Sequence, residues 1–277
     1  MLNDILVHLP VERPAEPVID CAVSVAKLFG AHLEAIACAY QPINPAIVVG
    51  ASAAYYADAS QYNTNLDKAT QRLDQFKATV GAAGLPHDGR TIADSPALAN
   101  ETLSLIGRMY DLNIVAQPDP AHPCNHDGLA EAVLFNSGRP MLLVPYIHAG
   151  PLQPNRVLIC WDGSRPAARA VHDAMPWLKR AKTIEIVTIN EDPDVVGDTS
   201  CDALVAHLSR HKLSATTNKF NCDSGKIHSA LLSLAADSCA DLMVMGGYGH
   251  SRLREFILGG VTRGMFKSLT VPTLMAH

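Results

Sequence analysis

The sequence of 277 residues has no long hydrophobic run, no dense basic cluster and no paired-cysteine motif. No stretch approaches the roughly 18–20 uncharged apolar residues that a membrane span requires. The 22 Lys and Arg residues are scattered and are outnumbered by 27 Asp and Glu, so a basic nucleic-acid-binding face is not expected. The N-terminus carries Asp4 and no basic flank, which is not typical of a secretory signal. We therefore expect a cytoplasmic protein with neither a membrane nor a nucleic acid as partner.

Cysteine usage points to the same compartment. The seven cysteines are scattered, their number is odd, and none belongs to a CxxC pair. Such usage is typical of reduced thiols in a cytosol rather than of a disulfide framework. Only 18% of the residues are charged and 48% are hydrophobic, which is enough for a large core, and the length favours about two domains.

Two halves of the chain present the same order of apolar segments. "DILVHLP" (4–10) and "RVLICWDGS" (156–164) each open a half, and each is followed by apolar residues at helical spacing. Later in each half, "DLNIVAQ" (111–117) corresponds closely to "DLMVMGG" (241–247). Short strands that alternate with helices predict an α/β fold, with a parallel sheet covered on both faces in each half.

A proline-rich joint, "PYIHAGPLQPN", separates the halves, and we predict domains at 1–147 and 155–277. The first domain carries an additional segment at 41–61, rich in Pro, Ala and Tyr, to which no role is assigned. The apolar strand "TVPTLMAH" ends the chain. Because an exposed sheet edge tends to be covered or paired, we expect a homodimer.

Five glycines cluster between positions 246 and 260 of the segment "MGGYGHSRLREFILGGVTRG" (245–264). Gly246 directly follows an apolar strand, at the edge where α/β folds bind ligands. A loop without Cβ atoms lets backbone N–H groups approach an anion, and helix N-termini add a favourable dipole. The spacing G-x-x-G, nine residues, G-G therefore predicts a phosphate site, with turns and helix caps as the alternative. No Walker A motif is present, and a dinucleotide fingerprint is weak.

This segment resembles the nucleotide-binding signature of the universal stress protein family, in its ATP-binding branch. The second half matches that family throughout, and the first half matches in layout only. The resemblance implies two tandem Rossmann-like (adenine nucleotide alpha hydrolase-like) domains. Each would have a five-stranded parallel sheet of order 3-2-1-4-5 with helices on both faces. The resemblance also implies binding of ATP, ADP or AMP, with or without Mg²⁺.

The resemblance assigns roles to single residues as well. Asp162 would hold the ribose hydroxyls, with a Mg²⁺ contact or a cap of the turn "DGSRP" as alternatives. The backbone of Ile189 would meet the adenine edge, and Met245 would line the pocket. The phosphates would be surrounded by Gly246, Gly249, Gly259, Gly260, Val261 and Thr262. Many members have Ser or Thr at the position of Gly260, so one hydroxyl contact is missing here. His250 either touches a phosphate or faces solvent.

The first half lacks these features, and we expect no nucleotide there. It has "HLPVE" in place of "WDGS", and "QPDPAHPCNHD" (117–127) in place of the glycine loop. In that loop His122, Cys124 and His126 alternate beside Asp127, and a transition metal could take such ligands. Because alternate residues of an extended chain point in opposite directions, we expect an exposed polar loop and no metal.

No nucleophile, base and orienting group occur together near the glycine segment, so no catalytic residue is predicted. We predict a stress-response regulatory protein with one adenine nucleotide site in the second half. A slow Mg²⁺-dependent ATP-hydrolysing or adenylate-transferring enzyme that uses the same pocket is one alternative. A nucleotide-free interaction scaffold is the other.

Overall fold

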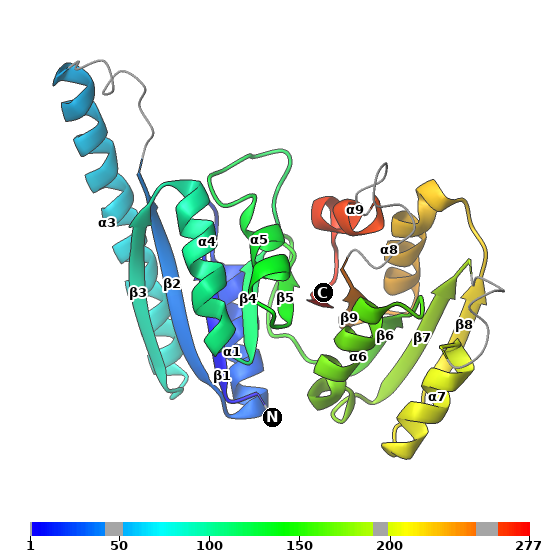
Figure 1. The fold of residues 1–277 in the computed structure, drawn as a ribbon. Coiled ribbons are helices and arrows are strands. Elements are labelled where there is room, and N and C mark those ends of the chain that lie inside the picture. Colours follow the sequence, from blue (N-terminus) through cyan, green and yellow to red (C-terminus); the bar gives the residue numbers. More distant parts are fainter. Residues whose placement is uncertain (1, 42–51, 191–198, 248–259) are drawn as a thin grey trace. The chain divides into compact units, whose positions relative to one another are not determined.

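The computed structural model describes residues 2–41, 52–190, 199–247 and 260–277. The chain divides into two compact units (Figure 1). The N-terminal unit comprises Leu2–Arg139 with Ala149–Pro151, and the C-terminal unit comprises Pro140–His148 with Leu152–His277. Both units are α/β, which confirms the predicted fold class. Within the described residues, no helix has the length and apolar content to cross a membrane.

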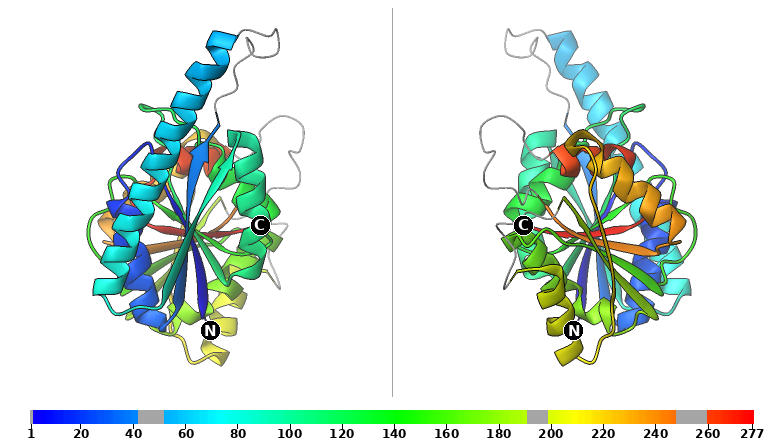
Figure 2. Two further views of the ribbon diagram at one scale, coloured as in Figure 1. Left: turned by 90° about the vertical axis from the view of Figure 1, so that its left-hand side faces the viewer. Right: turned by 90° about the vertical axis from the view of Figure 1, so that its right-hand side faces the viewer.

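The N-terminal unit is built on parallel strands in the order β3-β2-β1-β4. The strands are β1 (Asp4–Leu9), β2 (His32–Tyr40), β3 (His87–Asp94) and β4 (Leu112–Ala116). The helices are α1 (Glu16–Phe29), α3 (Ser52–Ala82), α4 (Pro96–Ile106) and α5 (Leu129–Asn136). Figure 2 shows α1 and α3 on one face of this sheet and α4 and α5 on the other. Every residue of β4 is buried, as expected for a parallel strand covered on both faces.

Helix α3 includes part of the segment to which the sequence assigned no role. It begins at Ser52 and runs for 31 residues, and Figure 1 shows it extending beyond β2 and β3. Residues 42–51 lie outside the described part of the chain. Four apolar residues at helical spacing in this helix are buried, namely Ala69, Leu73, Phe76 and Val80.

The C-terminal unit contains five parallel strands in the order β8-β7-β6-β9-β10. They are β6 (Arg156–Cys160), β7 (Thr183–Ile189), β8 (Thr216–Phe220), β9 (Leu242–Gly246) and β10 (Thr273–Ala276). This is the predicted order 3-2-1-4-5. The helices are α6 (Arg165–Leu178), α7 (Cys201–Arg210), α8 (Ile227–Asp237) and α9 (Gly260–Ser268). Figure 2 shows α6 and α7 on one face and α8 and α9 on the other.

Strand β5 (Met141–Val144) lies within the predicted first domain, 1–147. It is grouped with the C-terminal unit, where it pairs antiparallel with β10. Leu142 lies opposite Leu274 in this pairing. The outer edge of β10 is thereby covered within the chain. The edge argument for a homodimer was therefore wrong, and the homodimer itself stays a prediction.

One hydrogen-bond arrangement recurs at the start of the fourth strand in both units. Asp111 precedes β4, and its carboxylate accepts a hydrogen bond from the backbone N–H of Asn3 at 2.8 Å. Asp241 precedes β9, and its carboxylate accepts from the backbone N–H of Arg156, also at 2.8 Å. Asp111 and Asp241 occupy equivalent positions in the two halves of the sequence. Each of them joins the start of the fourth strand of its unit to the start of the first strand by a hydrogen bond.

Candidate functional site

A pocket of about 210 Å³ lies at the carboxyl ends of β6, β7 and β9 in the C-terminal unit. This is the edge at which parallel α/β sheets bind ligands. Six of the predicted site residues line it: Asp162, Ile189, Met245, Gly246, Val261 and Thr262. A wider hollow of about 470 Å³ lies at the opposite end of β6 and β7, beside Arg156 and Lys182, where this fold does not place its ligands.

The remaining predicted residues are not all within the described chain. Gly249, His250 and Gly259 lie outside it. Gly260 opens α9, so Val261 and Thr262 bring the first turn of this helix to the pocket. The N–H groups of a first helical turn have no partner within the helix and carry its positive dipole end. The end of α9 at the pocket therefore suits an anionic group.

Asp162 lies in the turn between β6 and α6. Its Oδ1 atom accepts a hydrogen bond from the backbone N–H of Ser164 at 3.0 Å. Gly163 has φ of 71°, and Ser164 caps α6 by accepting from the N–H of Ala167 at 3.3 Å. The turn-capping alternative for Asp162 is thus present in the structure. The side chain is nevertheless exposed and lines the pocket, so the turn also presents its carboxylate to a ligand.

Thr188 is a pocket residue that the sequence analysis missed. Thr188 is 4% exposed, and its hydroxyl has no hydrogen-bond partner among the residues that the structure describes. A buried hydroxyl without a partner destabilises a fold by about 1–3 kcal/mol. Threonine is common in β-strands, so the sequence alone gave no reason to single out Thr188 as a pocket residue.

Asn190 fixes the pocket rim beside Ile189. Its backbone has φ of 54°, a left-handed conformation that asparagine tolerates better than most residues. Its side-chain amide donates to the carbonyl of Cys222 at 2.7 Å and accepts from the N–H of Cys222 at 2.9 Å. These bonds tie the end of β7 to the chain that follows β8. The backbone predicted to meet the adenine is therefore held against the chain that follows β8.

The first two glycines of the cluster have structural explanations. A Cβ at Gly246 would lie 2.5 Å from the backbone nitrogen of Ala167, so the end of β9 touches the first turn of α6 directly. The N–H of Gly247 donates to the carbonyl of Ala276 at 2.8 Å. This N–H extends the sheet and is not available to a phosphate. Close packing explains Gly246, a reason that neither the phosphate interpretation nor the turn-and-cap alternative had included.

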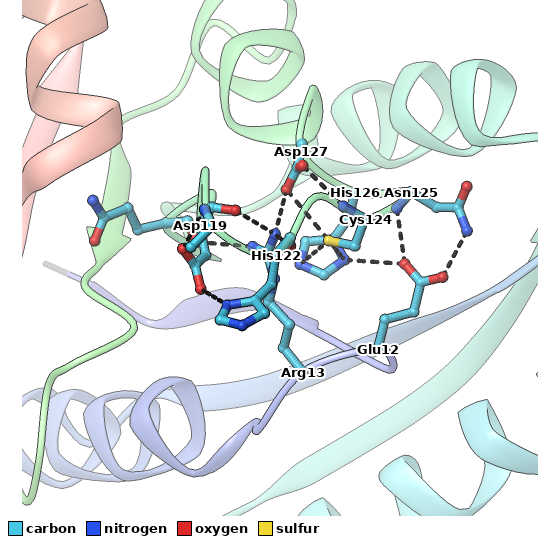
Figure 3. Close-up of polar contacts among 10 residues, drawn as sticks. Glu12, Arg13, Asp119, His122, Cys124, Asn125, His126 and Asp127 are labelled. Atoms are coloured by element: carbon cyan, nitrogen blue, oxygen red, sulfur yellow. Dashed lines mark hydrogen bonds and ion pairs between the residues drawn. The ribbon is translucent and has the colours of Figure 1, made fainter.

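In the N-terminal unit, the loop that replaces the glycine segment is held by Arg13 (Figure 3). The guanidinium group of Arg13 donates to the carbonyl oxygens of Gln117, Asp119 and His122. It also forms an ion pair with Asp127 at 2.8 Å, and its side chain is only 9% exposed. Bonds from one buried cation to four acceptors fix this loop in place.

Cys124 and His126 lie together in this loop, contrary to the sequence-based expectation. The Sγ atom of Cys124 is 3.2 Å from Nδ1 of His126, because the chain turns between Cys124 and Asp127. His126 is only 2% exposed, so the prediction of an exposed loop was wrong for it. The side chain of His122 is 80% exposed and pairs with Asp119. For His122 the prediction of an exposed polar loop is therefore confirmed.

Burial sets the protonation of this pair. It lowers the pKa of His126 to about 4, with the charge of Arg13 acting in the same direction and those of Asp127 and Glu12 opposing. Burial also raises the pKa of the Cys124 thiol to about 12. At neutral pH the pair is therefore a thiol beside a neutral imidazole.

Comparison with known proteins finds a family similarity in the C-terminal unit. The family model described as "Universal stress protein family" matches residues 154–277. A curated relative from Synechocystis sp., "Universal stress protein Slr1230", is 26% identical over 123 residues, which is 43% of this chain and 41% of that relative. The match therefore spans less than half of the relative's length.

Solved structures share the fold of the whole chain. A universal stress protein from Archaeoglobus fulgidus DSM 4304 superimposes with a TM-score of 0.74 and 16% identity, covering 100% of this chain and 98% of the other. A protein of Pseudomonas aeruginosa UCBPP-PA14, described as a candidate universal stress protein, superimposes with a TM-score of 0.64 and 14% identity. It covers 99% of this chain and 93% of its own.

Proposed function

We propose that this protein is a stress-response regulator that binds an adenine nucleotide in the C-terminal unit, because the universal stress protein family model matches residues 154–277. The observation that carries the proposal is the convergence of separate segments on one pocket. Asp162 follows β6, Ile189 ends β7, Met245 and Gly246 end β9, and Val261 lies in the first turn of α9. These segments are far apart in the sequence, and each was predicted to contribute to the nucleotide site.

The chemistry of the pocket suits the parts of a nucleotide. Ile189, Met245 and Val261 offer apolar contact to a base, and the hydroxyl of Thr188 offers a hydrogen bond to one of its polar edges. The Asp162 carboxylate can accept hydrogen bonds from ribose hydroxyls. The first turn of α9 offers N–H groups to phosphates, and Mg²⁺ would accompany ATP or ADP. With glycine at 260, the terminal phosphate has one hydroxyl contact fewer.

We infer one site per chain. In the N-terminal unit, Pro10 stands where Asp162 stands in the C-terminal unit, so no carboxylate is available for ribose. The loop after β4 is fixed by Arg13 and carries no glycine. The N-terminal unit therefore has a structural role in this proposal. All seven cysteines are free, which supports a cytoplasmic location.

Calorimetric titration of ATP, ADP and AMP, each with and without Mg²⁺, tests the proposal. Asp162→Asn removes the negative charge while an amide oxygen can still accept the Ser164 N–H, so the turn is retained. We expect one nucleotide site per chain in the wild type. In Asp162→Asn the affinity should be at least about tenfold lower, because about two hydrogen bonds between the carboxylate and the ribose hydroxyls are lost or weakened. Asp202→Asn is the matched control, because the Asp202 side chain is 81% exposed and its ion pair with Lys219, at 3.6 Å, is a surface one.

Each other outcome has a definite meaning. Two sites per chain would contradict the assignment of the pocket to the C-terminal unit alone. Equal affinity in both variants would remove Asp162 from the site. The absence of binding to any of the three nucleotides would favour the interaction scaffold. Mg²⁺-dependent hydrolysis that is lost in Asp162→Ala would show an enzyme that uses this pocket.

A further inference from the structure

We propose that Glu12, Cys124 and His126 form a zinc site in the N-terminal unit (Figure 3). The three side chains come from two segments, the turn after β1 and the loop after β4. This site lies in a different unit from the nucleotide pocket and does not depend on it.

The distances suit one small ion. One ligand atom from each of the three residues lies within 4.8 Å of the other two. The Sγ atom of Cys124 is 3.2 Å from Nδ1 of His126, and that nitrogen is 4.0 Å from Oε2 of Glu12. Tetrahedral zinc, with bonds of about 2.0–2.3 Å, holds its ligand atoms roughly 3.3–3.8 Å apart. Side-chain adjustments of up to about 1 Å therefore complete the geometry.

The donor set selects the class of metal. A thiolate, an imidazole and a carboxylate together are typical of zinc, whereas Ca²⁺ and Mg²⁺ prefer oxygen alone. Three protein ligands leave a fourth position for water, the arrangement of zinc sites that are not purely structural.

The ligands are oriented by a second layer of hydrogen bonds. The Glu12 carboxylate accepts from the backbone N–H of Asn125 at 2.8 Å and from its side-chain amide at 2.6 Å. Asp127 accepts from the backbone N–H of Cys124 at 2.9 Å. Outer partners of this kind hold metal ligands in position and are part of functional metal sites.

The charges of the site also balance once a divalent ion is bound. Glu12, Asp127 and the Cys124 thiolate contribute three negative charges. Arg13, which is paired with Asp127, and the ion contribute three positive charges. Arg13 thus pairs with Asp127, whose carboxylate is not one of the three proposed ligands, and leaves the Glu12 carboxylate available to the ion.

His8 supplies an independent observation. It is 1% exposed in the core, and within the described part of the chain neither of its ring nitrogens has a hydrogen-bond partner. Its ring centroid lies 5.3 Å from that of His126. Two unsatisfied polar atoms in the core are costly. A water bound to zinc at the fourth position would offer this ring the partner that it lacks.

The experiment measures zinc binding by protein that has been stripped with a chelator and kept reduced. Zn²⁺ is titrated in competition with a chromophoric chelator, and Co²⁺ is used as a spectroscopic probe. We expect one ion per chain and a cobalt–thiolate charge-transfer band. Cys124→Ser and His126→Ala should each weaken binding by at least about tenfold, and Cys124→Ser should abolish the band. His122→Ala is the matched control on the same loop and should bind like the wild type.

Three results would overturn the site: no stoichiometric zinc in the wild type, an equal loss in His122→Ala and His126→Ala, or a cobalt spectrum without the thiolate band. Circular dichroism checks that each variant folds. Should the variants of half-buried Cys124 and buried His126 fail to fold, Glu12→Gln provides the test, since Glu12 is exposed and an amide keeps its shape. We expect it to weaken zinc binding by about tenfold, and unchanged binding would contradict the proposal.

Discussion

A Cβ placed on Gly246 would lie 2.5 Å from the backbone nitrogen of Ala167, closer than such atoms approach in folded proteins. The pocket floor at the end of β9 therefore packs directly on the first turn of α6. We predict that Gly246→Ala lowers the free energy of unfolding by about 1–3 kcal/mol, because the added carbon meets backbone and not a movable side chain. Urea denaturation measures this value.

The matched control for that change is Gly225→Ala. A Cβ at Gly225 has no atom within 4 Å. Its free energy of unfolding should stay within about 0.5 kcal/mol of the wild type. Similar losses in the two variants would contradict the close-packing explanation.

Thr188→Val should increase stability. The hydroxyl of Thr188 is buried without a partner, and valine has the same shape, so the free energy of unfolding should rise by about 1 kcal/mol. Nucleotide binding should weaken about fivefold in the same variant, because the hydroxyl is then missing from the pocket. Thermal unfolding without ligand and calorimetry with ATP measure the two effects.

Thr273→Val is the control of opposite sign. The Thr273 hydroxyl is equally buried but donates to the carbonyl of Val271 at 2.9 Å. Its loss should lower stability by about 1 kcal/mol. The explanation for Thr188 fails if both variants change stability in the same direction.

Arg13→Gln should destabilise the N-terminal unit. Arg13 is 9% exposed and holds the loop 117–127 through several carbonyls and Asp127, so we expect a loss of about 2–3 kcal/mol. Arg90→Gln is the comparison, because Arg90 pairs with Glu34 at 2.8 Å but is 53% exposed. Its loss should not exceed about 1 kcal/mol. Equal losses in denaturation experiments would show that Arg13 does not anchor the loop.

The contribution of His32 should depend on pH. Partial burial lowers its pKa, but hydrogen bonds and charges from Asp4 and Asp88 outweigh this and raise the pKa above its ordinary value of 6.5. A raised pKa in the folded state means that the contribution is complete below the unfolded pKa and is lost as pH rises through the folded pKa. His32→Gln should therefore cost more stability at pH 6 than at pH 8.5. A cost that is the same at both values would contradict this pairing.

Much of the C-terminal pocket was predictable because its residues follow strands. Asp162 and Gly246 each come directly after a buried apolar run, and parallel strands bring such positions to one edge. Thr188 was not predictable, since its exceptional feature is a missing partner and not its type or spacing. The reason for Gly246 was also hidden, because the contact with Ala167 joins segments almost eighty residues apart.

In the N-terminal loop 117–127, by contrast, the sequence showed the residues but not their arrangement. The alternation of His122, Cys124 and His126 was visible, but the argument from an extended chain failed because a turn brings two of them together. Glu12 lies more than a hundred residues away, and no spacing rule connects it to Cys124. The antiparallel pairing of β5 with β10 was equally hidden, because apolar strands of both orientations have the same composition.

The most direct test of the central claim is photoaffinity labelling with an azido-adenine analogue of ATP, followed by mass-spectrometric mapping of the labelled peptides. The account predicts labelling that unlabelled ATP competes away, confined to peptides of the C-terminal unit that contain Ile189 or Met245. Labelling of the N-terminal unit, or labelling that ATP does not reduce, would contradict it.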